Sequence, residues 1–172
     1  MLDKLWSPWR SKYIESFKPG AQKDERCLFC RVLEENNDEK NYIIYRSERS
    51  FIMMNLFPYN SGHLMVIPNQ HASTFNELEE ETCVECMRNM KISMNIINNA
   101  IQPHGFNVGA NIGRIAGAGI EDHVHFHIVP RWTGDSNFMP IINDVKVISE
   151  AIEDTYRKLM ASLDKALKEM KC

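Results

Sequence analysis

Three histidines alternate with apolar residues in the segment His123-Val124-His125-Phe126-His127. Successive side chains of a β-strand point to opposite faces, so this spacing places the three imidazoles on one face and the apolar side chains on the other. Imidazole can act as nucleophile, acid and base near neutral pH. The alternation therefore predicts a strand with a chemically active face. Two other interpretations stay open at this point, a metal-ligand set and a plain polar surface.

A glycine-rich segment at 113–119, GRIAGAG, leads toward the histidines. Glycines let the backbone approach a ligand closely and turn its N–H groups toward an anion. Taken alone, such a segment is equally typical of a flexible turn. Its position before the histidines favours phosphate binding, and phosphate with histidine indicates phosphoryl or nucleotidyl transfer.

The segment 123–129, HVHFHIV, matches at every position the signature of the histidine triad (HIT) family, in which three histidines alternate with apolar residues and two apolar residues follow. The segments 51–55 and 62–68, followed by His71, resemble the central strands of that family. The resemblance covers about residues 27–131. It implies a HIT-like fold and nucleotide substrates.

Four further segments resemble a bacterial branch of this family that is diadenosine tetraphosphate phosphorylase-like or fragile histidine triad-like. They are 5–10, 116–120, 129–132 and 134–140. The resemblance implies nucleotidyl transfer on dinucleoside polyphosphates, by phosphorolysis or hydrolysis, with inorganic phosphate as an acceptor and magnesium accompanying the substrate. Alternatives are a nucleoside phosphoramidate hydrolase or another nucleotidyltransferase, and, in a different class, a non-catalytic nucleotide-binding module.

The resemblance also assigns roles to individual residues. It implies that His125 attacks an α-phosphate and forms a covalent nucleotidyl-histidine, that His127 holds or protonates phosphate and leaving-group oxygens, and that His123 orients the triad. The implied nucleotide-binding residues, with the glycine-rich segment included, are Asn55, His63, Asn111, Gly117 and Gly119. Among them, the resemblance implies that Asn55 binds the ribose hydroxyls and that His63 supports the triad.

The sequence departs from many relatives just before the triad. Where those relatives carry Gln, Ser or Thr, this chain has Ala118 and Gly119, so a side-chain donor is missing. We expect the missing donor to leave room for an acceptor larger than water, which favours phosphorolysis over hydrolysis.

Cys27 and Cys30 have a spacing at which two thiolates can hold one zinc ion if two more ligands are supplied. A rival set would pair them with Cys83 and Cys86, but those two lie in a predicted helix, where cysteines more often serve as small apolar residues. Some relatives complete the site with two histidines. The implied structural zinc ligands are Cys27, Cys30, His71 and His123.

Hydrophobic periodicity predicts the elements that position these residues. Strands are predicted at 42–45, 51–55, 63–67, 106–112 and 123–129, and helices at 77–101 and 147–170. Strands grouped apart from helices indicate an α+β fold, a five-stranded antiparallel sheet with two main helices. We expect one HIT domain over 1–172, with an N-terminal arm at 1–26, a core at 27–131 and a C-terminal loop and helix at 132–172.

The overall composition is that of a globular protein, with 172 residues of which 44% are hydrophobic and 25% are charged. A net charge of −3 argues against dedicated nucleic-acid binding. Since no segment is long and apolar enough for a membrane span or a signal peptide, we expect a cytoplasmic protein, and the family resemblance implies a homodimer. Most methionines have the spacing of core residues, Met87 among them. The roles of Trp132 and of Trp6 and Trp9 in the arm stay open.

Overall fold

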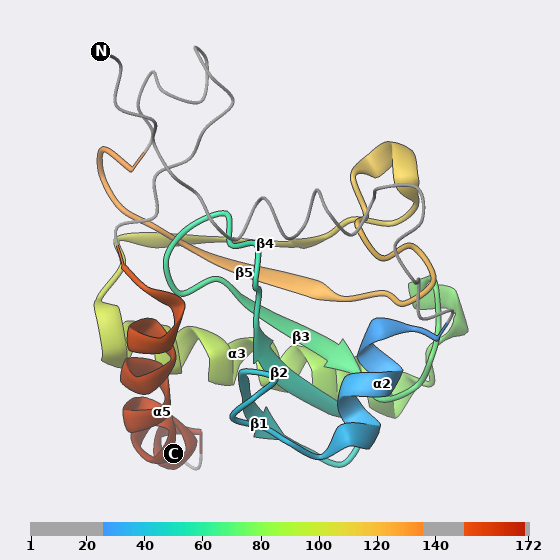
Figure 1. Ribbon diagram of the computed structural model, residues 1–172, viewed down its shortest axis with the longest axis horizontal. Coiled ribbons are helices and arrows are strands. Elements are labelled where there is room, and N and C mark those ends of the chain that lie inside the picture. The colour runs from blue at the N-terminus through green and yellow to red at the C-terminus, as the bar shows by residue number, and fades with distance from the viewer. Residues whose placement is uncertain (1–25, 136–149, 171–172) are drawn as a thin grey trace.

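The computed structural model describes residues 26–135 and 150–170 (Figure 1). Its elements in chain order are α2 (Leu28–Glu35), β1 (Ile43–Arg46), β2 (Ser50–Met54), β3 (Leu64–Pro68), the short 3₁₀ helix η1 (Phe75–Glu77), α3 (Glu80–Ile101), β4 (Gly105–Ala110), the 3₁₀ turn η2 (Arg114–Ala116), β5 (Phe126–Arg131) and α5 (Ile152–Glu169). The predictions for Trp6, Trp9 and the segment 136–140 lie outside the described residues.

The five strands form one antiparallel sheet in the order β1-β2-β3-β5-β4. β5 lies between β3 and β4, with His127 opposite Met65 of β3 and opposite Gly109 of β4. This arrangement confirms the predicted α+β fold with a five-stranded antiparallel sheet. It also places the histidine strand inside the sheet, where hydrogen bonds on both sides hold its backbone.

The two faces of the sheet carry separate hydrophobic clusters, because alternate side chains of each strand point to opposite sides. One cluster joins the sheet to α3 and α5 through Ile52, Val66, Ile96 and Leu159. The other joins the opposite face to α2 through Phe29, Phe51, Met53, Met65 and Ile67. Since Met65 pairs with His127, the histidine face is the face that α2 covers in part.

Three sequence predictions need correction. The helix α2 was not predicted, because its eight residues are too few for a clear period. The last helix begins at Ile152 in the described part of the chain, not at 147.

The strand predicted at 123–129 begins only at Phe126. Its partner β3 ends at Pro68, which has no N–H to continue the ladder. The backbone N–H of Val124 instead donates to the carbonyl of Ala72, at 2.7 Å. Among the helices described, none has the length and apolar character to cross a membrane.

Candidate active site

The three histidines of the predicted triad are all buried near the start of β5. Only His127 belongs to the strand, while His123 and His125 lie in the extended segment before it. The rings of His125 and His127 are 4.8 Å apart and nearly perpendicular. The sequence prediction that these imidazoles lie together on one side is therefore confirmed for this pair.

A backbone contact fixes the proton of His125. Its Nδ1 lies 2.9 Å from the carbonyl oxygen of His123, and a carbonyl can only accept. Nδ1 must therefore carry the hydrogen, which leaves a lone pair on Nε2. The Phe29 ring packs against this imidazole at 5.0 Å between centroids. His125 thus presents an oriented, unprotonated nitrogen, which is what nucleophilic attack requires.

A chain of hydrogen bonds fixes the proton of His127 in the opposite sense. The N–H of Tyr59 donates to Nδ1 of His63 at 3.1 Å, so this nitrogen is unprotonated and the hydrogen of His63 is on Nε2. That Nε2–H donates to Nδ1 of His127 at 3.0 Å. The hydrogen of His127 must then be on Nε2. His127 thus offers an N–H donor where His125 offers a lone pair.

Burial keeps the triad neutral. It lowers the pKa of His123 and His125 below the usual histidine value, and it lowers the pKa of His127 to about 4, with the neighbouring His125 contributing. A charged imidazole is costly in a buried site because water no longer solvates it. All three rings are therefore mainly neutral at pH 7, and at His127 the hydrogen bond from His63 requires this because Nδ1 accepts it.

The predicted nucleotide-binding residues differ in how closely they lie to the triad. Asn55 lies closest, since its Nδ2 is 3.4 Å from Nδ1 of His63 and its Oδ1 accepts from the N–H of Phe57 at 2.9 Å. Asn111 is half-buried and follows the last β4–β5 pair, Ala110 with Phe126. The structure thus places Asn55 in contact with the histidine network, and Asn111 at the start of the glycine-rich loop.

The glycine-rich loop runs from β4 toward His123 and contains the turn η2. Gly117 has a φ of +92°, a conformation that side chains other than glycine rarely adopt. Gly117 and Gly119 are exposed, whereas Ala118 is buried. Within β4, Gly109 lies opposite His127, and a Cβ there would have no atom within 4 Å. The absence of a side chain at Gly109 leaves space beside His127.

The four predicted metal ligands come together at the other end of the triad. Sγ of Cys27 lies 3.2 Å from Nδ1 of His123, and Sγ of Cys30 lies 3.4 Å from Nδ1 of His71 and 3.7 Å from Nδ1 of His123. The ligand atoms of all four residues lie within 4.8 Å of one another. His123 has Nε2 at 2.9 Å from the carbonyl oxygen of Pro68, so its hydrogen is on Nε2 and its Nδ1 lone pair points at the sulfur atoms.

The rival cysteine set is not brought together. Cys86 is buried in the cluster beneath α3, on the opposite face of the sheet from Cys27 and Cys30. Without a cation the pKa of the Cys30 thiol is raised to about 11, first by burial and then by the neighbouring Cys27. A positive ion would offset both effects, since thiolate is the form that binds metals.

Other sequence predictions have mixed outcomes. His104 is exposed, as expected, and Trp132 is half-buried. Met87 was predicted to be a core residue but is 60% exposed, because it lies on the outer face of α3. Tyr59, whose ring stacks on His63 at 4.9 Å, was not predicted. No spacing signal marks Tyr59 or Phe29, since their importance comes from contacts across the fold.

Comparison with known proteins supports the family and the fold. The HIT domain family model matches residues 36–134. Over 165 residues the chain is 36% identical to an AP-4-A phosphorylase of Mycobacterium tuberculosis, and the match covers 94% of this chain and 84% of that protein. Over 105 residues it is 34% identical to an adenosine 5′-monophosphoramidase of Schizosaccharomyces pombe, covering 61% of this chain and 74% of that protein.

Among solved structures, the chain resembles a zinc-bound histidine triad family protein of Mycobacterium smegmatis. The TM-score is 0.68 at 22% identity, and the match covers 83% of this chain and 96% of that one. This likeness shows that the two chains share the same fold.

Proposed function

The chain belongs to the histidine triad family, and we propose that it transfers a nucleotidyl group from dinucleoside polyphosphates through a covalent intermediate on His125. One observation carries the proposal. The hydrogen bond from Nδ1–H of His125 to the carbonyl of His123 leaves Nε2 with its lone pair at neutral pH. The relative from Mycobacterium tuberculosis, an AP-4-A phosphorylase, supports this class of substrate.

The reaction proceeds in two displacements. Nε2 of His125 attacks the α-phosphorus, an N–P bond forms, and the P–O bond to the remaining nucleotide polyphosphate breaks. The Nε2–H of His127 donates a hydrogen bond to the departing oxygen. An acceptor oxygen then attacks the same phosphorus, the N–P bond breaks, and His125 regains its lone pair. With phosphate as acceptor, diadenosine tetraphosphate yields ADP and ATP.

The space beside the triad favours phosphate as the acceptor. Gly109 opposite His127, and Ala118 and Gly119 before the triad, supply no side-chain donor to hold a water molecule. Phosphate brings its own oxygens and needs more room than water. Gly117 and Gly119 would donate backbone N–H groups to phosphate oxygens, Asn55 would bind the ribose, and Asn111 would contact phosphate or ribose. Magnesium would accompany the polyphosphate chain.

Zinc fits the four-residue cluster as a structural ion. Tetrahedral zinc with Zn–S of about 2.3 Å and Zn–N of about 2.0 Å places sulfur about 3.5 Å from nitrogen. The sulfur–nitrogen distances of 3.2, 3.4 and 3.7 Å are near that value. The relative from Mycobacterium smegmatis is described as zinc-bound. The ion would tie α2 and the segment after β3 to His123, leaving His125 as the attacking histidine.

A homodimer is the proposed assembly. Val84 and Met87 on α3 are 65% and 60% exposed, and Val108 on the outer strand β4 is 47% exposed. A subunit contact would bury these exposed apolar side chains. Light scattering coupled to size exclusion should give the mass of two chains, and Val84→Glu should shift it toward that of one chain.

A second candidate reaction is hydrolysis of nucleoside phosphoramidates. The relative from Schizosaccharomyces pombe, an adenosine 5′-monophosphoramidase, favours it. The same pair of histidines serves both reactions, because His125 attacks the α-phosphorus in each and His127 offers its N–H to the leaving atom, whether nitrogen or oxygen. Which of the two reactions takes place depends on the group attached to the α-phosphate on the side that leaves.

Product analysis with diadenosine tetraphosphate tests the proposal. We expect ADP and ATP in the presence of phosphate, and no products without it. AMP and ATP formed without phosphate would indicate hydrolysis instead. Turnover of adenosine 5′-phosphoramidate alone would support the second candidate.

Variants at His125 test the covalent step. Quenching in an alkaline denaturant, which preserves the acid-labile N–P bond, followed by mass spectrometry should detect an adenylyl group on the parent chain. His125→Ala and the gentler His125→Asn should abolish both the adduct and turnover. His104→Ala is the matched control, because His104 is exposed and lies outside the triad. Nucleotide binding without turnover or adduct in the parent would indicate a binding module and contradict the proposal.

A further inference from the structure

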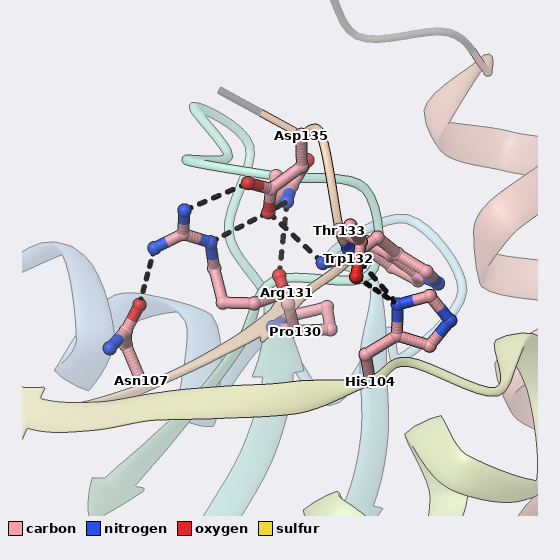
Figure 2. Close-up of polar contacts among 8 residues, drawn as sticks. His104, Asn107, Pro130, Arg131, Trp132, Thr133 and Asp135 are labelled. Carbon is pink, nitrogen blue, oxygen red and sulfur yellow. Dashed lines mark hydrogen bonds and ion pairs between the residues drawn. The ribbon is translucent and has the colours of Figure 1, made fainter. Parts of the chain in front are cut away.

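The carboxylate of Asp135 gathers four hydrogen bonds at the end of β5 (Figure 2). Nε and Nη2 of Arg131 donate to it at 2.6 and 2.8 Å, the N–H of Trp132 donates at 3.1 Å, and Nδ2 of Asn60 donates at 2.8 Å. Figure 2 also shows the Arg131 guanidinium turned toward Asn107, whose Oδ1 accepts at 2.7 Å. Asp135 thus joins the turn after β5 to a residue 75 positions earlier in the chain.

Asn60 connects this carboxylate to the loop that precedes β3. Its buried side chain also donates to the carbonyl of Pro130, at 3.0 Å. Its own carbonyl accepts the N–H of His63, at 3.2 Å. The Asn60 side chain is therefore held at β5 while its backbone holds the residue that supports the triad.

The neighbouring residue Tyr59 acts on His63 in two ways. Its N–H donates to Nδ1 of His63, and its ring stacks on that imidazole. The same ring lies 5.6 Å from the ring of His127. If the loop moved, His63 would lose this donor, its hydrogen could shift to Nδ1, and Nε2 would no longer donate to His127. Both rings could then adopt the other tautomer.

We propose that Asn60 and Asp135 form a clamp that fixes which nitrogens of His63 and His127 carry hydrogen, and that both are positioning residues for the reaction. The clamp holds Tyr59 in place, Tyr59 sets the tautomer of His63, and His63 sets that of His127. Asp135 lies one residue beyond the segment matched by the family model, residues 36–134. Nothing in that match assigns it a role.

Imidazole nitrogen NMR tests the clamp without substrate. Long-range ¹H–¹⁵N spectra of the parent at pH 7 should show hydrogen on Nε2 of both His63 and His127. In Asn60→Ala and in Asp135→Ala, we expect signals of the Nδ1–H tautomer to appear for both rings. Asn107→Ala is the matched control, because it removes one hydrogen bond from the same cluster but none on the path to His63.

The double variant separates the clamp from general damage. Because Asp135 acts through its contact with Asn60, Asn60→Ala with Asp135→Ala should shift the tautomers no further than Asn60→Ala alone, whereas independent effects would add. If an alanine variant does not fold, Asp135→Asn keeps the shape and removes the charge, and the same shift in smaller amount is expected. Parent-like spectra in folded Asn60→Ala and Asp135→Ala would overturn the proposal.

A kinetic test depends on the proposed function as well. The leaving nitrogen of adenosine 5′-phosphoramidate takes its proton from water and needs a hydrogen-bond donor beside it as the P–N bond breaks, whereas the p-nitrophenyl ester of AMP releases a stable anion. Losing the donor tautomer of His127 should lower kcat for the phosphoramidate by about three- to tenfold, and leave KM and the rate with the ester nearly unchanged.

The two proposals fail in different ways. If the clamp variants lowered kcat equally for the phosphoramidate and the ester, the clamp's role in catalysis would be overturned. If the parent turned over neither of these two substrates nor diadenosine tetraphosphate, the proposed function would fail. The NMR result would still show whether the clamp sets the tautomers.

Discussion

Acid should destabilise this protein through His127, and His127→Gln should remove a measurable share of that effect. Burial holds the pKa of His127 at about 4 in the folded protein, against 6.5 for an ordinary histidine. The unfolded chain therefore binds a proton at a higher pH than the folded chain does. The stability contributed by the neutral ring is complete above about pH 6.5 and is lost progressively as the pH falls toward 4.

The pKa difference sets an upper limit on the effect. A shift from 6.5 to about 4 corresponds to about 3 kcal/mol of unfolding free energy. The ring is buried but keeps 8% of its surface exposed. Solvent screening there reduces the expected loss to about 1–2 kcal/mol between pH 7 and pH 4.5. Gln can still accept from His63 and donate into the site, but it does not titrate in this range.

Urea unfolding followed by circular dichroism measures this loss. Parent and His127→Gln are compared at pH 7 and pH 4.5 with a metal chelator, so that both are metal-free. The remaining groups titrate alike in both proteins. Subtracting the variant's loss of unfolding free energy between pH 7 and pH 4.5 from that of the parent therefore isolates the contribution of His127. An equal loss in parent and variant would refute the reasoning, because it would mean that the ring is protonated as easily in the fold as in the unfolded chain.

Three further predictions concern single side chains. Phe29→Ala should lower the unfolding free energy by about 3–5 kcal/mol in urea titrations, because this ring is 1% exposed and packs on two triad histidines. A loss below about 1 kcal/mol would contradict this packing. Glu85→Ala should lower the unfolding free energy by about 2 kcal/mol, since the Glu85 carboxylate accepts from two serine hydroxyls and one backbone N–H. A fall in melting temperature no larger than that of a substitution at an exposed position would contradict this. Cys30→Ser should lower bound zinc measured by mass spectrometry, whereas Cys83→Ser should leave it unchanged; equal metal content in both variants would argue against the four-residue site.

Most of the sheet was predictable because its strands carry strong local signals. Runs of apolar and β-branched residues at 42–45, 51–55 and 63–67 predicted β1, β2 and β3 to within one residue at each end. The start of β5 was predicted three residues too early. Alternation alone cannot show that the partner strand ends at Pro68, because that limit lies in another part of the chain.

The family resemblance implies that His63 supports the triad, but the ring nitrogens that make the contact, and the contact between Asn60 and Asp135, were not predictable from the sequence. His63 and His127 are 64 residues apart, and Asn60 and Asp135 are 75 residues apart. No local pattern of residue types encodes such contacts, because they form only when β3 and β5 pair and the turn after β5 folds back. The helix α2, which brings Phe29 under the triad, was missed for a related reason, since packing rather than periodicity stabilises a helix of this length.

The sequence by itself determined which chemistry is available. Three imidazoles in alternation, two cysteines at metal-binding spacing and a glycine-rich loop are matters of residue type and local spacing, and local backbone geometry converts them into one face, one pair and one turn. The tertiary structure decided what each imidazole does. Whether a ring nitrogen is a lone pair or a donor depends on the group opposite it, here the carbonyl of His123 for His125 and the side chain of His63 for His127. Identical residue types thus receive different roles because the fold supplies each with a different partner.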